Sequence, residues 1–367
     1  MSESNSTSTR KGERDESKEG RTNRTIILLT SLVLISVACI VLLWDRYLHC
    51  DPQSPRIVQF DCVFTRRQKT PRLELPGVHQ LTNDYYYYQS PVWSPDGNTI
   101  AVMRNAENLP PGGPNPNAWE IVFINPDTGK LTEFDDPRFK DQANLYPSWS
   151  VETGQLAFIT QVPNPTDDLP WLTKNLLSLY SPKEDKFVEQ FECITCEWPA
   201  WISNSTIMVN MNLGNKVFGI AIFDINTRQF TELVRTDLIG PYSVSPDGKE
   251  ILMVDDQCTG IWKYTLGIES FISFIDSSEM HECDPNWSWN GQRLVYIEKD
   301  PSIGAPTYLT VSNADGSNPL RLLEPELALY QIRYPAWSPD GTRIVFTYGS
   351  EGASTIYIMD VPEQLQP

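Results

Sequence analysis

The chain has 367 residues, of which 40% are apolar and 11% aromatic, and it contains 20 glycines and 29 prolines. This composition supports a large folded domain and is typical of all-β proteins with many turns. The formal net charge of −18 argues against a nucleic-acid-binding protein, because a phosphate-binding surface needs a basic stripe.

The N-terminal part predicts a membrane anchor. Residues 1–24 contain no apolar residue after Met1, which indicates a disordered tail. Residues 25–44, TIILLTSLVLISVACIVLLW, carry no charge and are long enough to cross a bilayer as a helix. Six Lys and Arg residues lie within the fifteen residues before this segment, whereas only Arg46 and Arg56 lie within the fifteen after it. We therefore expect a cytoplasmic tail and an extracytoplasmic remainder.

We therefore predict a single-pass protein of the cell membrane with an uncleaved signal anchor over residues 25–44. Residues 45–74 would form a stalk. The alternative is removal of the apolar segment, since SVAC, which ends at Cys39, faintly resembles a lipoprotein processing site.

One phrase recurs six times after the stalk. The copies are SPVWSPDGNTIAVM, YPSWSVETGQLAFI, WPAWISNSTIMVN, PYSVSPDGKEILMV, DPNWSWNGQRLVYI and YPAWSPDGTRIVFT. Their anchor residues are Trp93, Trp149, Trp201, Val244, Trp287 and Trp337, spaced 43 to 56 residues apart. A period of this length is typical of four-stranded propeller blades.

Within a copy, the residues predict a strand, a tight turn and a second strand. The anchoring Trp would end the inner strand and wedge between neighbouring sheets. Ser-Pro-Asp-Gly would then reverse the chain, because Pro presets φ and Gly accepts the left-handed conformation. A third strand and usually a fourth follow each copy.

The last copy lacks an outer strand after Asp360, whereas GVHQLTN over residues 77–83 reads like one. We predict that this N-terminal strand closes the sixth blade, because closure leaves no open sheet edge. The predicted fold is thus an all-β, six-bladed β-propeller over residues 75–367.

The phrases SPVWSPDGNTIAV and YPAWSPDGTRIVF resemble the WD40-like (PD40) repeats of the TolB family and of many bacterial cell-envelope proteins. The resemblance covers roughly residues 75–362. It implies the propeller fold and a place in the cell envelope, and it leaves the activity open.

Propeller topology gathers the longest loops on one face. These are the insertions at 104–119 and 161–175 and the segments 83–89, 191–198 and 277–284. Aromatic side chains there could stack on sugars or peptide side chains, which makes this face a candidate recognition surface. The candidate ligand-binding residues are Tyr85, Tyr86, Tyr87, Tyr88, Trp119, Trp171 and His281. The alternative is that they pack the inserted loops against the disc.

Six cysteines lie beyond the predicted span, and an even number in an oxidising compartment suggests disulfides. Cys258 and Cys283 fall in neighbouring loops of the predicted propeller, and Cys193 and Cys196 could bridge locally. Cys50 and Cys62 would then close a loop in the stalk. For the CxxC pair, a redox or zinc site is the alternative, but no βαβ unit or second CxxC accompanies it.

No catalytic constellation is evident in the sequence. The chain has three histidines and lacks a G-x-S-x-G elbow. Neighbouring residues of HECD at 281–284 alternate in direction, so we predict no metal and no cofactor. The acidic pairs at 135–136, 167–168 and 255–256 leave an enzyme open.

We predict a non-catalytic propeller whose loop-rich face binds an envelope protein, a peptide or a glycan. The alternative is an envelope hydrolase or a glycan- or peptide-processing enzyme that uses acidic residues of that face.

Overall fold

The computed structural model describes residues 72–84, 86–105, 119–134, 136–139, 142–163, 173–193, 195–213, 217–255, 257–268, 270–302, 307–324, 330–350 and 353–367. The predicted tail, membrane span and stalk up to residue 71 lie outside these ranges. Among the residues described, no helix has the length and apolar character needed to span a bilayer.

The strands form six antiparallel sheets of four, which confirms the predicted six-bladed propeller. The inner strands are β2 (Tyr87–Trp93), β6 (Ala143–Trp149), β10 (Cys196–Ser203), β14 (Ile239–Val244), β18 (His281–Trp287) and β22 (Gln331–Trp337). The second strands are β3 (Ile100–Asn105), β7 (Leu156–Pro163), β11 (Thr206–Asn212), β15 (Glu250–Val254), β19 (Arg293–Lys299) and β23 (Arg343–Ser350).

The outer half of each blade contains two more strands. The third strands are β4 (Trp119–Ile124), β8 (Thr173–Ser181), β12 (Phe218–Asp224), β16 (Ile261–Thr265), β20 (Thr307–Asn313) and β24 (Ala353–Asp360). The outer strands are β5 (Leu131–Glu133), β9 (Lys186–Glu192), β13 (Gln229–Thr236), β17 (Ser270–Ile275), β21 (Leu320–Leu323) and β1 (Val78–Gln80). A short 3-10 helix, η1 (Glu363–Leu365), ends the chain.

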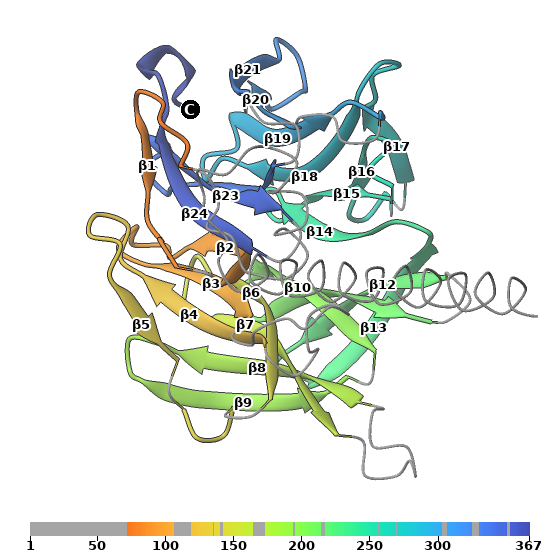
Figure 1. Ribbon diagram of the computed structural model, residues 1–367. Helices are drawn as coiled ribbons and strands as arrows, with labels where there is room; N and C mark the ends of the chain where they lie inside the picture. Colours follow the sequence, from red (N-terminus) through yellow and green to blue (C-terminus); the bar gives the residue numbers. More distant parts are fainter. Residues whose placement is uncertain are drawn as a thin grey trace, which may run out of the picture. The chain divides into compact units, whose positions relative to one another are not determined.

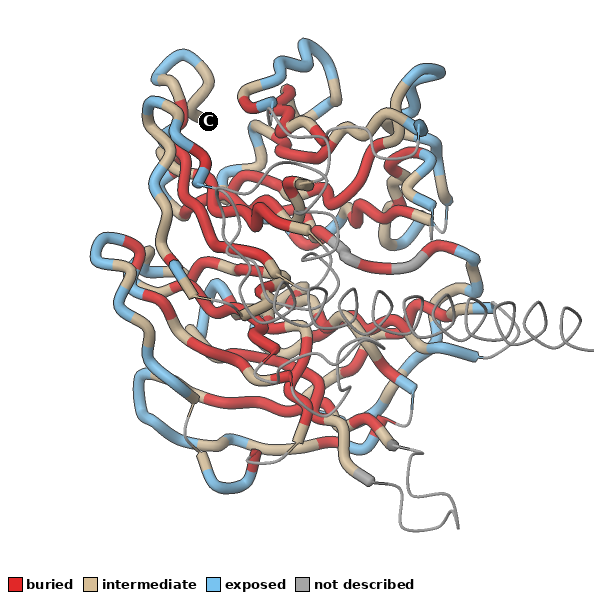
Figure 2. The backbone as a smooth tube through the Cα atoms, in the orientation of Figure 1, coloured by how far each residue is buried: buried red, intermediate tan, exposed pale blue. Residues whose placement is uncertain are grey.

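The inner strands contact one another in a closed ring, in the order β2, β6, β10, β14, β18, β22 and back to β2 (Figure 1). Buried residues concentrate on the strands, whereas most turns and the outermost segments are exposed (Figure 2). The second strands are the most apolar: Ile100, Ala101 and Val102 of β3 have no exposed surface. Adjacent blades cover both faces of these strands, which explains their continuous apolar runs.

The N-terminal strand closes the ring as predicted. In Figure 1, β1 lies beside β24, and the two pair antiparallel with Val78 opposite Met359 and Gln80 opposite Tyr357. Beyond the strand, the backbone N–H of Leu81 donates to the carbonyl of Ile356 at 2.8 Å. Blade six is therefore built from both ends of the propeller domain.

The Ser-Pro-Asp-Gly turns have the predicted chemistry. In the first, the Ser94 hydroxyl donates to the Asp96 carboxylate at 2.6 Å, and that carboxylate accepts the backbone N–H of Asn98 at 3.1 Å. Gly97 has a φ of 70°, a conformation that costs other residues free energy. The local sequence is thus sufficient to reverse the chain between inner and second strands.

Every inner strand contains a β-bulge before its anchor residue. In five blades the bulge holds a non-glycine residue in the left-handed region, with φ between 48° and 57°, directly before a proline. These residues are Ser90, Tyr146, Trp198, Asp284 and Tyr334. The pairing between the inner and the second strand shifts register at the bulge. The two strands are paired on both sides of it.

This bulge corrects one sequence-based prediction. The segments 83–89, 191–198 and 277–284 are predicted as loops before the inner strands, but their C-terminal parts are strand. Tyr87 and Tyr88 belong to β2, Cys196–Trp198 to β10 and His281–Asp284 to β18. In the sequence, the residue before the proline and the proline itself resemble the start of a strand. In the structure they form a bulge within a strand that begins several residues earlier.

Three of the anchoring tryptophans bond to a neighbouring blade. The indole N–H of Trp93 donates to the Ala336 carbonyl, that of Trp149 to Val92 and that of Trp201 to Ser148, at 3.1 to 3.3 Å. Each bond thus joins a blade to the preceding one. Val244 offers no such donor, and in blade four the Ser243 hydroxyl instead accepts the backbone N–H of Trp287 at 2.9 Å.

Two predicted disulfides are present. Cys193–Cys196 closes a local loop before β10, and Cys258–Cys283 joins the loop after β15 to β18 of the next blade. The Cα atoms are 5.5 Å and 5.1 Å apart, within the usual range for a bridge. Cys50 and Cys62 lie outside the described residues.

Candidate binding site

A cavity of about 390 Å³ occupies the centre of the ring, lined by all six inner strands. It extends from the bulges to the turns that follow the anchors, where Val151 is 63% exposed. The cavity therefore opens on the face of the short turns, opposite the loop-rich face that the sequence singles out.

Aromatic residues and prolines make up nearly half of the lining. The prolines are Pro91, Pro147, Pro199, Pro246, Pro285 and Pro335. The aromatic residues are Trp93, Tyr146, Trp149, Trp198, Trp201, Trp287, Trp289, Tyr334 and Trp337. Among the described residues that line it, only Glu152 and Asp284 are charged. Such a surface favours ligands with apolar or planar groups.

The bulges send large side chains into this ring. Tyr146 stacks on Trp198 of the next blade with ring centroids 4.0 Å apart. Trp198 in turn lies against Gly240 of blade four, where an added Cβ would be 2.4 Å from the indole Cγ. Only glycine leaves room for the indole at that point.

An ion pair holds the opposite side of the ring. Asp284 accepts hydrogen bonds from the Arg333 Nε at 2.6 Å, from its Nη2 at 3.2 Å and from the backbone N–H of Tyr334 at 3.0 Å. Asp284 raises the pKa of the Arg333 guanidinium above its usual value, mainly through the attraction of opposite charges. The carboxylate is therefore occupied and its charge is balanced.

Three polar atoms in the lining residues are buried without a hydrogen-bond partner. They are the Ser90 Oγ and the indole nitrogens of Trp287 and Trp337. The equivalent indoles of blades one to three all donate to a neighbouring blade. Because an unpaired buried donor costs free energy, these two indoles favour an arrangement in which an acceptor reaches them.

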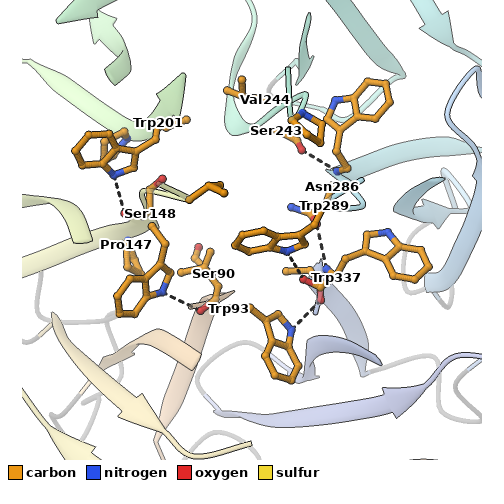
Figure 3. A pocket seen from close by; sticks show the side chains of 18 of the residues that line it. Ser90, Trp93, Pro147, Ser148, Trp201, Ser243, Val244, Asn286, Trp289 and Trp337 are labelled. Carbon is orange, nitrogen blue, oxygen red and sulfur yellow. Dashed lines mark hydrogen bonds between the residues drawn. The ribbon is translucent and has the colours of Figure 1, made fainter. Parts of the chain in front are cut away.

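Trp289 is the cavity residue that the repeat does not explain. It replaces the proline of the Ser-Pro-Asp-Gly turn in blade five, and its indole N–H donates to the Trp337 carbonyl at 2.9 Å. Figure 3 shows its ring reaching toward the middle of the labelled side chains. Sequence reasoning missed it, although SWNG in place of SPDG was the available signal.

The predicted tyrosine run does not form an exposed strip. Tyr88 is fully buried: its hydroxyl donates to Asp84 at 2.7 Å, and its backbone N–H donates to the Ser354 hydroxyl at 2.7 Å. Tyr86 and Tyr87 are half-buried, with Arg104 4.6 Å from the Tyr86 ring. The hydrogen bond to Ser354 joins blade one to blade six, and Tyr88 belongs to the core at that boundary. Tyr85 lies outside the described residues.

The other predicted ligand-binding residues are dispersed. Trp119 is 9% exposed, and its ring lies 5.8 Å from that of Tyr87. His281 is half-buried in β18, opposite Lys299 of β19. Trp171 lies outside the described residues. A ligand-binding role for Tyr86, Tyr87, Trp119 and His281 stays a prediction.

The two described members of the acidic pairs have local structural partners. Asp136 pairs with Arg138, and Asp255 accepts the backbone N–H groups of Gln257 and Thr259 at 3.0 and 2.8 Å. In the part of the chain that the structure describes, no group of three His, Cys, Asp or Glu side chains is placed to hold a metal ion. Asp135, Asp167, Asp168 and Asp256 lie outside it.

Comparison with known proteins points to one propeller type. The chain is similar to the Tol-Pal system protein TolB of Xylella fastidiosa (strain M12), with 38% identity over 73 residues, and to that of Xanthomonas campestris (strain B100), with 36% over 73 residues. Each match covers 19% of this chain and 15% of the relative, so it spans a small part of those proteins. No protein-family model matches the chain.

Solved structures share the fold. A structure assigned as TolB from Agrobacterium tumefaciens aligns with a TM-score of 0.52 at 16% identity, covering 78% of this chain and 97% of that one. The uncomplexed acylaminoacyl peptidase of Pyrococcus horikoshii aligns with a TM-score of 0.51 at 12% identity, covering 74% and 44%. At such identities the likeness concerns the fold and not the activity. Together with the repeat and the six four-stranded blades, these matches show a six-bladed propeller that is similar to that of TolB.

Proposed function

We propose that the chain is a non-catalytic, membrane-anchored binding protein that takes an envelope protein, a peptide or a glycan into its central cavity. The observation that carries this proposal is the cavity of about 390 Å³ lined by residues of all six blades. Its size and aromatic lining fit a ligand pocket. The ligand would thus enter from the face of the short turns, and not from the loop-rich face that the sequence singles out.

The polar atoms of the cavity support a ligand that accepts hydrogen bonds. The unpaired indole nitrogens of Trp287 and Trp337 can only donate. Peptide carbonyls and sugar hydroxyls both supply acceptors, and both kinds of ligand stack on aromatic rings. An entering ligand would have to displace the side chains that now cover these atoms.

The charges of the cavity favour binding over hydrolysis. A glycosidase needs two carboxyl groups across the scissile bond, one of them free to donate a proton. Of the two carboxylates in the lining, Asp284 is held by Arg333 in an ion pair, which leaves Glu152 near the exposed turns. A hydrolase or lyase that uses other residues remains the alternative function.

An envelope location agrees with the sequence and with the relatives. The related proteins are named for the Tol-Pal system, which favours an envelope protein as partner. The disulfides Cys193–Cys196 and Cys258–Cys283 suit an oxidising compartment outside the cytoplasm.

The binding site can be tested by replacing Trp289. We expect Trp289→Ala to weaken binding by roughly tenfold or more, because a central aromatic side chain usually dominates binding. The full chain is titrated with defined peptides and oligosaccharides while its tryptophan fluorescence is recorded. Trp289→Phe separates the ring from its indole N–H, and Val188→Ala on β9 is the control at the rim.

An unchanged affinity of the Trp289→Ala variant for every ligand that the wild type binds would contradict the cavity as the site. Chemical conversion of a bound peptide or glycan would instead support the enzyme alternative.

The anchor is tested by cell fractionation. The wild-type chain should stay in the membrane fraction after alkaline carbonate washing, and removal of residues 25–44 should release it, because those residues are the uncharged segment. Intact mass spectrometry of the membrane-bound protein provides the check on processing. A mature chain that begins at Cys39 would show that the segment is cleaved.

A further inference from the structure

The outer strand of blade four differs from those of the other blades. Strand β17 has the sequence SFISFI and carries no ionisable side chain. Each of the other five outer strands contains at least one, for example His79 in β1, Glu133 in β5, Glu189 in β9, Arg235 in β13 and Arg321 in β21. Charged residues on an edge strand discourage pairing with another chain, so β17 lacks a common form of protection.

Exposed apolar side chains accompany this uncharged edge. Ile272, in the middle of β17, is 48% exposed, and Ile268, in the turn that enters the strand, is 70% exposed. Isoleucine is favoured in strands because its branched side chain packs on a pleated surface. The two side chains therefore offer apolar contacts to an added strand.

One edge of β17 pairs with β16, and the other edge faces away from blade four. Among the described strands, β17 pairs with β16 alone and ends its four-stranded sheet (Figure 1). The C-terminal end of the strand, at Ile275, lies close to Gly316 in the β20–β21 turn of blade five. The part of the edge before that end presents backbone N–H and C=O groups that another extended chain can pair with. This geometry is that of β-strand addition.

The charges around β17 are acidic. Lys263 on β16 forms an ion pair with Glu250 at 3.0 Å and lies over the Phe274 ring at 4.5 Å. Beyond the strand, Asp276 and Glu279 are exposed. A basic segment would meet attraction here, whereas a second copy of a chain with a net charge of −18 would meet repulsion.

We propose that β17 is a docking edge that adds an extended segment of a basic partner protein as a fifth strand of blade four. The partner strand alternates apolar residues, which contact Ile268 and Ile272, with basic residues drawn to Asp276 and Glu279. The edge lies apart from the central cavity, which β17 does not line.

The probe is a fluorescent peptide of about ten residues that alternates valine and lysine, as a strand with one apolar and one basic face requires. A second peptide with proline in place of every other valine cannot complete a ladder. Fluorescence anisotropy with the full chain measures binding. Ile272→Lys adds a charge to the edge, and Thr231→Lys adds the same charge at an exposed position of β13.

We expect the alternating peptide to bind the wild type and the Thr231→Lys variant equally, and to bind the Ile272→Lys variant roughly tenfold more weakly. The proline peptide should not bind. Ile268→Lys provides a second variant outside the ladder, and circular dichroism confirms that each variant folds. Trp289→Ala should leave this binding unchanged, so failure at the edge is distinguishable from failure at the cavity.

Equal affinities of the Ile272→Lys and Thr231→Lys variants would overturn the proposal, as would binding of the proline peptide or no binding by the wild type. A wild-type dimer in light scattering that Ile272→Lys converts to monomer would assign the edge to a second copy and overturn the basic partner.

Discussion

At the scale of single residues, Glu282 shows how a sheet can bury a carboxyl group. It is 1% exposed in β18, directly opposite Glu298 of β19, and its Oε2 has no hydrogen-bond partner. Burial raises the pKa of Glu282 to about 7; hydrogen bonds from Ser277 oppose the shift, and the charges of Glu298 and Asp276 add to it. The folded protein therefore favours the protonated acid below about pH 7.

The pH dependence of unfolding tests this assignment. Because the pKa is higher in the folded than in the unfolded state, the stability tied to Glu282 is fully present below about pH 4.5 and is lost as the pH rises through about 7. We expect Glu282→Gln to remove this loss, which amounts to about 3 kcal/mol at most. Urea unfolding at about pH 5 and about pH 8 measures it.

The exposed Glu279 supplies the control for this experiment. Glu279→Gln should leave the difference between the two pH values as in the wild type. If Glu282→Gln also leaves it unchanged, the carboxyl group does not titrate as described.

At the scale of elements, the β-bulge of the inner strands determines which side chains reach the central cavity. In five of the six inner strands, one extra residue turns the residue before the proline toward the cavity, and in this way Tyr146, Trp198 and Tyr334 come to line it. A left-handed non-glycine residue costs about 1 to 3 kcal/mol, and such strain persists where the surrounding packing imposes it. The anchors at the wedge positions were predictable, but these three residues were not.

The closing strand makes its own prediction. Leu81→Pro removes the N–H that donates to the Ile356 carbonyl at 2.8 Å, and we expect it to destabilise the propeller by about 1 to 3 kcal/mol. Leu81→Ala separates the loss of side-chain packing from the loss of the hydrogen bond. Thermal unfolding gives the total, and hydrogen exchange should show faster exchange in β24 than in β11.

If the Leu81→Pro variant has the same melting temperature and the same β24 exchange rate as the Leu81→Ala variant, the hydrogen bond between Leu81 and Ile356 contributes little to ring closure.

At the scale of the whole molecule, the six blades, their turns, the closing strand and two disulfides were predictable from the sequence. The reason is that the repeating unit is encoded locally: an anchor residue followed by a turn sequence specifies one hairpin, and its recurrence along the chain specifies a ring. The long loops of the loop-rich face did not indicate the position of the central cavity, because loop length alone does not show where a cavity opens. The predicted Tyr88 belongs to the seam between blades one and six.

What the amino-acid order determined by itself was the repeat, the number of blades and an uncharged span of membrane length, since these depend on patterns along the chain. Only the folded ring decided that Trp289, Tyr146 and Asp284 line one cavity and that β17 is an uncharged edge. Residues of six blades far apart in sequence meet at the axis only when the ring closes, and no local pattern records which of their polar atoms remain unpaired there.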